Sequence, residues 1–184
     1  MTRNAASSAL YGAAILPRLA LYVLVLLNLP AVAGQAQETA VTGTTVSLSV
    51  GGEVARPLRL TAAAISALPH QKLQVKEHDG REVTFEGVAL SELLRLAGVA
   101  SGEQLRGRNL SLYLVAEAKD GYRAVFALPE LDPAFTDRVV LLADRRDGKA
   151  LPDREGPWRI VVPDEKRQAR WVRQVVSLTV RRAQ

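Results

Sequence analysis

The stretch Phe85-Glu86-Gly87-Val88-Ala89-Leu90-Ser91-Glu92-Leu93-Leu94-Arg95-Leu96-Ala97-Gly98 contains the clearest structural signal in the sequence. Its apolar residues at positions 90, 93, 94 and 97 follow the i, i+3, i+4, i+7 spacing of one helix face. Gly98 stands where a C-terminal helix cap belongs. Just before this stretch, Asp79-Gly80 is typical of a hairpin turn, from which residues 83–85 return as a strand. The sequence therefore predicts a hairpin strand that leads into a short helix with one buried face.

Short strand patterns surround this unit on both sides. Alternating or continuous apolar runs predict strands at 46–50, 73–75, 83–85, 110–116, 122–128, 139–143, 158–162 and 175–180. Thr61 is suited to cap a short helix over 62–67, and Pro129 opens a helical turn. Because strands and helices do not alternate strictly, we expect a single β-rich α+β domain with a mixed or largely antiparallel sheet.

The first 36 residues have the order of a secretory signal. Two arginines precede or flank a small-residue stretch, the uncharged apolar run 19–27 follows, and small residues end the segment, with Ala33 and Ala36 as alternative cleavage positions. The other interpretation is a retained anchor, but a bilayer-spanning helix needs roughly 20 apolar residues. We therefore expect a signal peptide over 1–36, a flexible lead-in over 37–45, and a periplasmic domain over 46–182 that is not embedded in the membrane.

Charge and cysteine content exclude several classes of function. The 184-residue chain has no cysteine, so it can form no disulfide and supply no thiolate metal ligand or cysteine nucleophile. Its net charge is +5, and acidic and basic residues alternate along most of the chain. A nucleic-acid binder usually gathers its basic residues into a patch, so we expect no nucleic-acid partner. Phosphate-binding loops of the P-loop type and Gly-x-Ser-x-Gly elbows are missing as well.

The two histidines, His70 and His78, are the only conventional candidates for a metal site. A zinc site takes three or four ligands, and only Asp79 beside His78 adds a further one. The favoured interpretation is two solvated loop histidines, and we expect no metal.

Both tryptophans of the chain lie beside arginines, in the pairs Trp158-Arg159 and Arg170-Trp171. An indole face and a planar guanidinium fork together suit a flat polar heterocycle, or an anion near one. The alternative is that the tryptophans pack in the core and the arginines are solvated.

The turn Asp120-Gly121-Tyr122-Arg123 is a further candidate. Its glycine lets the backbone approach a ligand, and the hydroxyl of Tyr122 can donate a hydrogen bond. The alternative is an ordinary hairpin.

Taken in order, these motifs resemble the molybdopterin-binding domain of the sulfite oxidase family. The resemblance covers about residues 46–182, and each motif is loose while the order and spacing are specific. The residues that carry it are Gly52-Glu53-Val54, Pro57-Leu58-x-Leu60-Thr61, Phe85-Glu86-Gly87-Val88-x-Leu90-x-x-Leu93-Leu94-x-x-Ala97-Gly98, Ala118-x-Asp120-Gly121-Tyr122, Leu141-Leu142-Ala143, Gly148-x-x-Leu151, Gly156-Pro157-x-Arg159-Ile160-Val161-Val162-Pro163 and Arg170-Trp171-Val172.

The resemblance implies a mixed α+β fold that holds a pterin, either a reduced pterin or molybdopterin, in a cleft. The residues that it places along the cleft are Tyr122, Trp158, Arg159, Arg170 and Trp171. Lys166 and Arg167 would lie on the phosphate side of the cofactor.

Two departures from the family pattern bear on function. Catalytic members bind molybdenum through a cysteine, and here Val75 or Lys76 falls near that position; neither can replace a soft thiolate ligand. Members that carry the molybdenum cofactor are exported folded by the twin-arginine route, whereas the apolar run here follows no Arg-Arg pair, which favours general secretion. No catalytic residue is therefore assigned.

Short exported members without the cysteine resemble periplasmic pterin-binding proteins of bacterial signalling systems. Those proteins relay a reduced pterin to a membrane receptor that controls cyclic-di-GMP turnover. We expect this non-catalytic role here. The alternatives are a molybdenum cofactor-dependent oxidoreductase with an unusual metal ligation, and an interaction domain that has kept the fold and lost the ligand.

Overall fold

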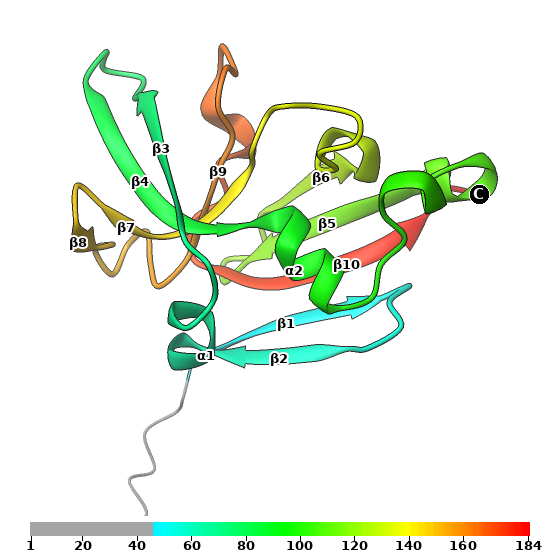
Figure 1. Ribbon diagram of the computed structural model, residues 1–184. Coiled ribbons are helices and arrows are strands. Elements are labelled where there is room, and N and C mark those ends of the chain that lie inside the picture. Colours follow the sequence, from blue (N-terminus) through cyan, green and yellow to red (C-terminus); the bar gives the residue numbers. More distant parts are fainter. Residues whose placement is uncertain (1–45) are drawn as a thin grey trace, which may run out of the picture. The chain divides into compact units, whose positions relative to one another are not determined.

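The computed structural model describes residues 46–184, so the predicted signal peptide and lead-in lie outside the described residues. The described part consists of two five-stranded sheets with short helices at their edges and connections (Figure 1). This arrangement confirms a β-rich α+β fold. Its buried apolar side chains form one continuous core.

The first sheet is mixed and joins the two ends of the domain. Its strands, in the order β2-β1-β10-β5-β6, are β2 (Leu58–Thr61), β1 (Ser47–Gly52), β10 (Val175–Arg182), β5 (Leu112–Ala118) and β6 (Arg123–Ala127). β1 and β10 run parallel, with Val50 opposite Leu178, and the other pairs are antiparallel. The first and last strands of the domain therefore lie side by side in the sheet (Figure 1).

The second sheet is antiparallel and carries the predicted hairpin. Its strands are β3 (Gln71–Lys76), β4 (Glu82–Ala89), β7 (Leu141–Arg146), β8 (Lys149–Ala150) and β9 (Arg159–Val161), the last of which pairs with β7. The β3–β4 hairpin and the segment that follows β9 both project upward in the view of Figure 1. Sequence patterns predicted the longer strands, but not β2 and β8.

Two short α-helices and four 3-10 turns connect the strands. They are α1 (Ala62–Ser66), α2 (Leu90–Leu96), η1 (Gly102–Gln104), η2 (Gly107–Ser111), η3 (Leu128–Glu130) and η4 (Gln168–Arg170). Thr61 caps α1 as predicted, since its hydroxyl accepts the backbone N–H of Ala64. Among residues 46–184, no helix is long and apolar enough to cross a membrane.

The predicted strand-to-helix unit forms as the periodicity indicates. The side chains of Leu90, Leu93 and Leu94 on α2 are buried, and Gly98 after the helix has a φ of +70°. Immediately before α2, the ladder between β4 and β7 has a bulge between Glu86 and Gly87. A Cβ atom on Gly87 would collide with the backbone of β7, so only glycine lets the two strands approach this closely.

Candidate functional site

The Arg159 and Trp171 side chains lie next to each other at the meeting point of the two sheets. Arg159 is the first residue of β9, and its guanidinium carbon is 5.2 Å from the ring centroid of Trp171. The same carbon is 5.4 Å from the ring centroid of Phe85, and the Phe85 and Trp171 rings meet edge to face at 5.9 Å. The indole Nε1 of Trp171 donates to the carbonyl oxygen of Val162 at 2.8 Å. The guanidinium therefore packs against two adjoining aromatic rings.

Two carboxylates hold the buried end of Arg159. Its Nη1 donates to Oε2 of Glu155 at 2.7 Å and lies 3.8 Å from Oε1 of Glu77. Arg146 completes the cluster, with its Nη1 3.6 Å from Glu155 and 3.4 Å from Glu77. Arg159 is only 3% exposed, and this burial lowers its pKa, which the charge of Glu155 and its hydrogen bond oppose. An arginine so placed stays charged near neutral pH.

One polar atom of Arg159 is left over. Its Nε is buried and has no hydrogen-bond partner among residues 46–184. Buried donors without a partner are rare in folded proteins and call for a specific explanation. The Arg159 side chain also forms part of the wall of a cavity.

That cavity, here called the Trp171 cavity, has a volume of about 320 Å³. Its wall is formed by Ala118, Asp120, Tyr122, Arg159, Gln168, Ala169, Trp171, Val172 and Arg173. Tyr122 is 50% exposed, and its hydroxyl donates to the carbonyl oxygen of Ala169 at 2.7 Å. This bond ties the β5–β6 turn to η4. Tyr122, Arg159 and Trp171, three of the residues singled out in the sequence, thus line one cavity.

A second hollow of about 430 Å³ also has Trp171 in its wall. Val75 and Lys76, at the end of β3, line it from the opposite sheet edge, together with Glu82 and Glu165. Gln168, which lines the Trp171 cavity, donates from its Nε2 to the carbonyl oxygen of Lys76 at 3.2 Å. The end of β3 is therefore anchored beside the Trp171 cavity.

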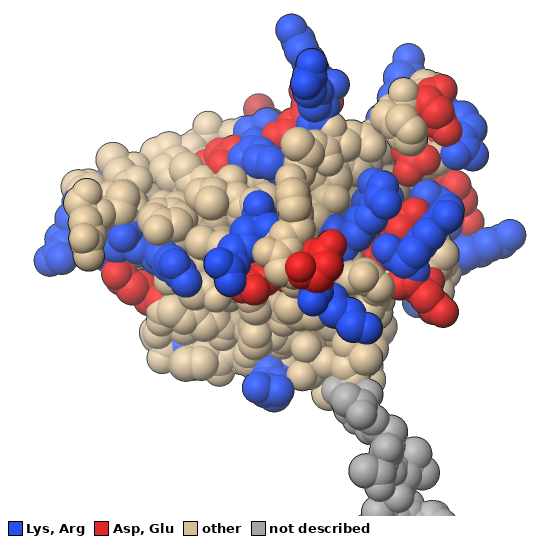
Figure 2. Space-filling model, turned by 180° about the vertical axis from the view of Figure 1, so that it is seen from behind, with Lys and Arg blue, Asp and Glu red and all other residues tan. Residues whose placement is uncertain are grey.

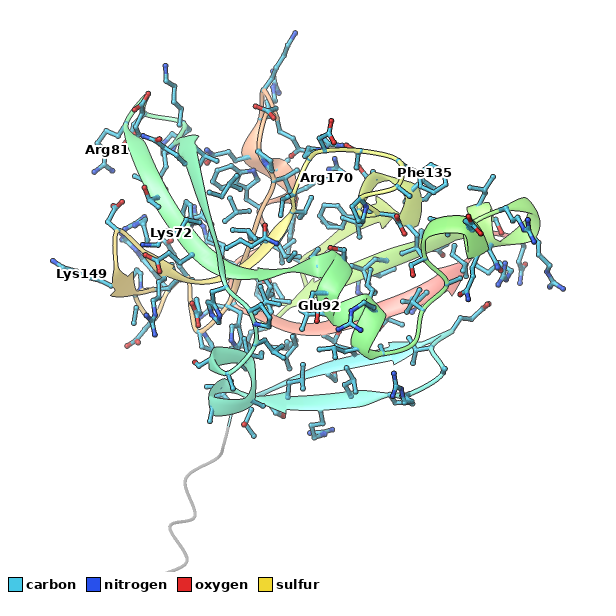
Figure 3. The ribbon with its side chains drawn as sticks, in the orientation of Figure 1. Lys72, Arg81, Glu92, Phe135, Lys149 and Arg170 are labelled. Atoms are coloured by element: carbon cyan, nitrogen blue, oxygen red, sulfur yellow. The ribbon has the colours of Figure 1, made fainter. Side chains whose placement is uncertain are left out.

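Arg170 has a different place from its neighbour Trp171. Its Nη1 donates to both carboxylate oxygens of Glu130, at 3.0 and 3.1 Å, and to the carbonyl oxygen of Val125, while Nε donates to Glu165 at 2.7 Å. Burial alone would lower the pKa of Arg170, but these hydrogen bonds outweigh it and raise the pKa. The side chain lies between the segment after β9 and β6 (Figure 3). We call these contacts the Arg170 clamp. The Arg170 side chain itself lines none of the four hollows described for residues 46–184.

Trp158, Lys166 and Arg167 also lie away from the Trp171 cavity. Trp158 is 1% exposed and packs in the core, where it borders a hollow of about 1070 Å³ beside α1 and the starts of β1 and β10. Lys166 and Arg167 are exposed on the segment between β9 and η4. Another hollow, of about 330 Å³ between α2 and η3, contains none of the predicted residues. On the face shown in Figure 2, basic and acidic side chains lie interspersed.

Sequence reasoning missed several residues of the site. Glu77 and Glu155 carry the buried charge that balances Arg159, and Gln168 and Arg173 complete the wall of the cavity. Glu77 lies far from Arg159 along the chain, so no local pattern could reveal the pair. Asp120 was part of the candidate turn, and its position two residues before Tyr122 was the signal available.

The sequence model of the oxidoreductase molybdopterin-binding domain matches residues 35–184. The chain belongs to this family. The resemblance inferred from the sequence motifs is thereby confirmed. No curated protein matches the chain.

A solved structure similar to this member of the molybdopterin-binding family is the sulfane dehydrogenase SoxCD from Paracoccus pantotrophus. The two share 23% sequence identity with a TM-score of 0.58, over 73% of this chain and 37% of the SoxCD chain. At this identity the likeness concerns the fold. The chain here spans well under half the length of that protein.

The residues of this family member fit a pterin ring better than a metal held by the protein. Val75 and Lys76, near the position of the family's cysteine ligand, supply an aliphatic group and an ammonium, and Lys76 Nζ lies 3.9 Å from Glu82. Residues 46–184 contain no cluster of three histidine, aspartate or glutamate side chains suited to a metal ion. His70 is not a solvated histidine as expected, because its ring nitrogens contact the Leu68 carbonyl oxygen at 2.7 Å and Asp144 at 3.2 Å. The Trp171 cavity, in contrast, offers the exposed ring of Tyr122 and hydrogen-bond donors, which suit a pterin.

Proposed function

We propose that this domain binds the bicyclic ring of a pterin in the Trp171 cavity and acts as a binding protein without catalysis. The observation that carries the proposal is a cavity in which the buried pair Arg159 and Trp171 lies beside the exposed ring of Tyr122 and the exposed guanidinium donor of Arg173. A pterin presents carbonyl and ring-nitrogen acceptors that such a donor can satisfy. Membership of the molybdopterin-binding family supports the same ligand class.

The size and the walls of the cavity favour one ring system. Ligand pockets usually measure about 300–1,000 Å³, so a cavity of about 320 Å³ suits a single bicyclic ring better than a long cofactor. Trp171 is only 6% exposed, and the accessible aromatic face belongs to Tyr122. A ring placed against Tyr122 would have Arg159 and Trp171 as its inner wall.

The interactions are strong enough for useful affinity. An aromatic stack contributes about 0.5–1.5 kcal/mol beyond its burial. A hydrogen bond to a charged group contributes about 1.5–3 kcal/mol, and Arg159 and the exposed Arg173 are the two charged donors in the wall. Together with apolar burial, these contributions are consistent with micromolar binding, about −8 kcal/mol.

The proposal includes an exported protein in a signalling role. The pattern of residues 1–36 supports export to the periplasm, and the sequence without cysteine supports a role that needs no metal-bound thiolate. In this proposal the loaded domain relays the pterin to a membrane receptor of cyclic-di-GMP signalling. Stoichiometric molybdenum in protein purified from its native compartment would favour a molybdenum-dependent oxidoreductase instead.

A pair of Tyr122 variants tests the proposed site. Calorimetric titration of the purified domain with pterin, and with tetrahydropterin under anaerobic conditions, gives the affinity of the parent protein. Tyr122→Ala removes the exposed ring and should weaken binding by at least tenfold, because both the stack and its buried area are lost. Tyr122→Phe keeps the ring and loses only the hydrogen bond to Ala169, so its affinity should stay within about threefold of the parent.

The two tryptophans provide a matched control for the same proposal. Trp171→Phe changes the inner wall of the cavity, whereas Trp158→Phe makes the same change at an equally buried site elsewhere. Pterin affinity should fall for the first variant alone, with folding of both confirmed by circular dichroism. Equal effects of the two changes would place the site elsewhere, and a parent protein that binds no pterin would overturn the proposed function.

A further inference from the structure

Asp120 is the single carboxylate among the described residues that line the Trp171 cavity. It lies in the turn between β5 and β6, where Gly121 has a φ of +86°. The backbone N–H of Tyr122 donates to Oδ1 of Asp120 at 2.9 Å, which fixes the orientation of the carboxylate. Asp120 is exposed, and among residues 46–184 only its Oδ1 takes part in a hydrogen bond. The cavity thus presents one preoriented acceptor group beside the guanidinium donors of Arg159 and Arg173.

This arrangement matches the edge chemistry of one class of heterocycle. A 2-amino-4-oxo pteridine carries its exocyclic amino group next to the N3–H, so two donors point the same way. A carboxylate accepts two parallel N–H groups through its two oxygens, as it does from an arginine fork. The neighbouring 4-oxo group is an acceptor and needs a donor, which a guanidinium supplies. A 2,4-dioxo pteridine has an oxygen in place of the amino group, and that oxygen would face the carboxylate without a proton between them.

We infer that Asp120 is the specificity-determining residue of the Trp171 cavity and selects 2-amino-4-oxo rings over their 2,4-dioxo analogues. The inference rests on the proposed pterin-binding function and adds the orientation of the ring to it. The edge with the amino group faces the β5–β6 turn, and the 4-oxo edge faces the arginines. The discrimination arises mainly because the 2,4-dioxo ring binds poorly. Its 2-oxo group and the Asp120 carboxylate are both acceptors, so no hydrogen bond forms between them.

The substitution Asp120→Asn isolates this role. Asparagine keeps an oxygen that can accept the N–H of Tyr122, and Asn-Gly forms the same kind of turn as Asp-Gly, so the fold should be preserved. The change replaces the second oxygen with an NH₂ donor, which suits the 2-oxo group and opposes the 2-amino group. Asp153→Asn is the matched control, since Asp153 is an exposed aspartate that borders a different hollow.

The test is calorimetric titration of the parent, Asp120→Asn and Asp153→Asn proteins with pterin and with lumazine, its 2,4-dioxo counterpart. The parent and the Asp153→Asn protein should bind pterin at least tenfold more tightly than lumazine. In Asp120→Asn this ratio should fall to about one or reverse. If the parent binds both rings equally, or if Asp120→Asn keeps the parent's ratio, the inference is wrong while pterin binding stands. A parent that binds neither ring overturns the proposed function and the inference with it.

Discussion

Replacing Arg159 by methionine tests how strongly the buried charges of the site depend on one another. The substitution removes the guanidinium that packs against Phe85 and Trp171 and leaves Glu155 and Glu77 without their buried cation. Glu155 is 5% exposed, so water cannot readily compensate its charge. Methionine retains an unbranched apolar stem that can still pack against the rings.

The magnitude follows from the contacts that remain. Breaking a buried ion pair by removing one partner costs about 3–5 kcal/mol. Arg146 stays 3.6 Å from Glu155 and 3.4 Å from Glu77, so it offsets part of that loss. We therefore expect Arg159→Met to lower the free energy of unfolding by about 3 kcal/mol at neutral pH, using the lower end of that range. For a domain of this size, the melting temperature would fall by roughly 6–12 °C.

The assay is urea unfolding followed by far-UV circular dichroism. A double variant tests whether the unpaired carboxylate causes the loss of stability. Arg159→Met combined with Glu155→Gln removes the unpaired carboxylate and should recover about 1–2 kcal/mol of the loss. Arg145→Met, at an exposed arginine, should change stability by less than about 0.5 kcal/mol. A single variant that loses under about 1 kcal/mol, or a double variant no more stable than it, would refute this account of the cluster.

Two further predictions concern how the sheets are held near the site. Gly87→Ala should destabilise the domain by about 3 kcal/mol or more in urea unfolding, because the new Cβ would collide with the backbone of Leu142 and Ala143. Gly51→Ala, whose Cβ would meet no atom within 4 Å, should be nearly neutral, and a similar effect at both glycines would contradict the steric argument. Arg170→Met should cost about 1–2 kcal/mol in the same assay because the Arg170 clamp loses its bonds to Glu130, Glu165 and Val125. Arg167→Met changes an exposed neighbour and should have little effect, so equal losses would show that the clamp contributes nothing specific.

Local patterns predicted most of the fold because they report backbone geometry and one-sided burial. The spacing of Leu90, Leu93 and Leu94 predicted α2, and Asp79-Gly80 and Asp120-Gly121 predicted turns whose glycines have φ near +80°. The strands β2 and β8 escaped prediction. β8 has only two residues, and the four residues of β2 alternate between half-buried and exposed too briefly for a reliable pattern.

The candidate site was harder to predict because adjacent residues can face different surroundings. Trp158 and Trp171 looked equivalent in the sequence, each beside an arginine, yet one packs in the core and the other borders the proposed ligand cavity. Arg170 looked equivalent to Arg159 and instead fastens η4 to β6 and η3. Chain direction and strand register decide such differences, and neither can be read from a short motif.

The sequence by itself determined the family, most of the longer strands, the helix α2, and three residues of the Trp171 cavity: Tyr122, Arg159 and Trp171. These follow from composition, periodicity and motif order, which act over a few residues at a time. Only the tertiary structure decided that Glu77 joins Glu155 at Arg159 and that Asp120 lines the same cavity as Arg159. The physical reason is that these contacts join β3, β9 and the β5–β6 turn, which become neighbours only when the two sheets pack on a common core.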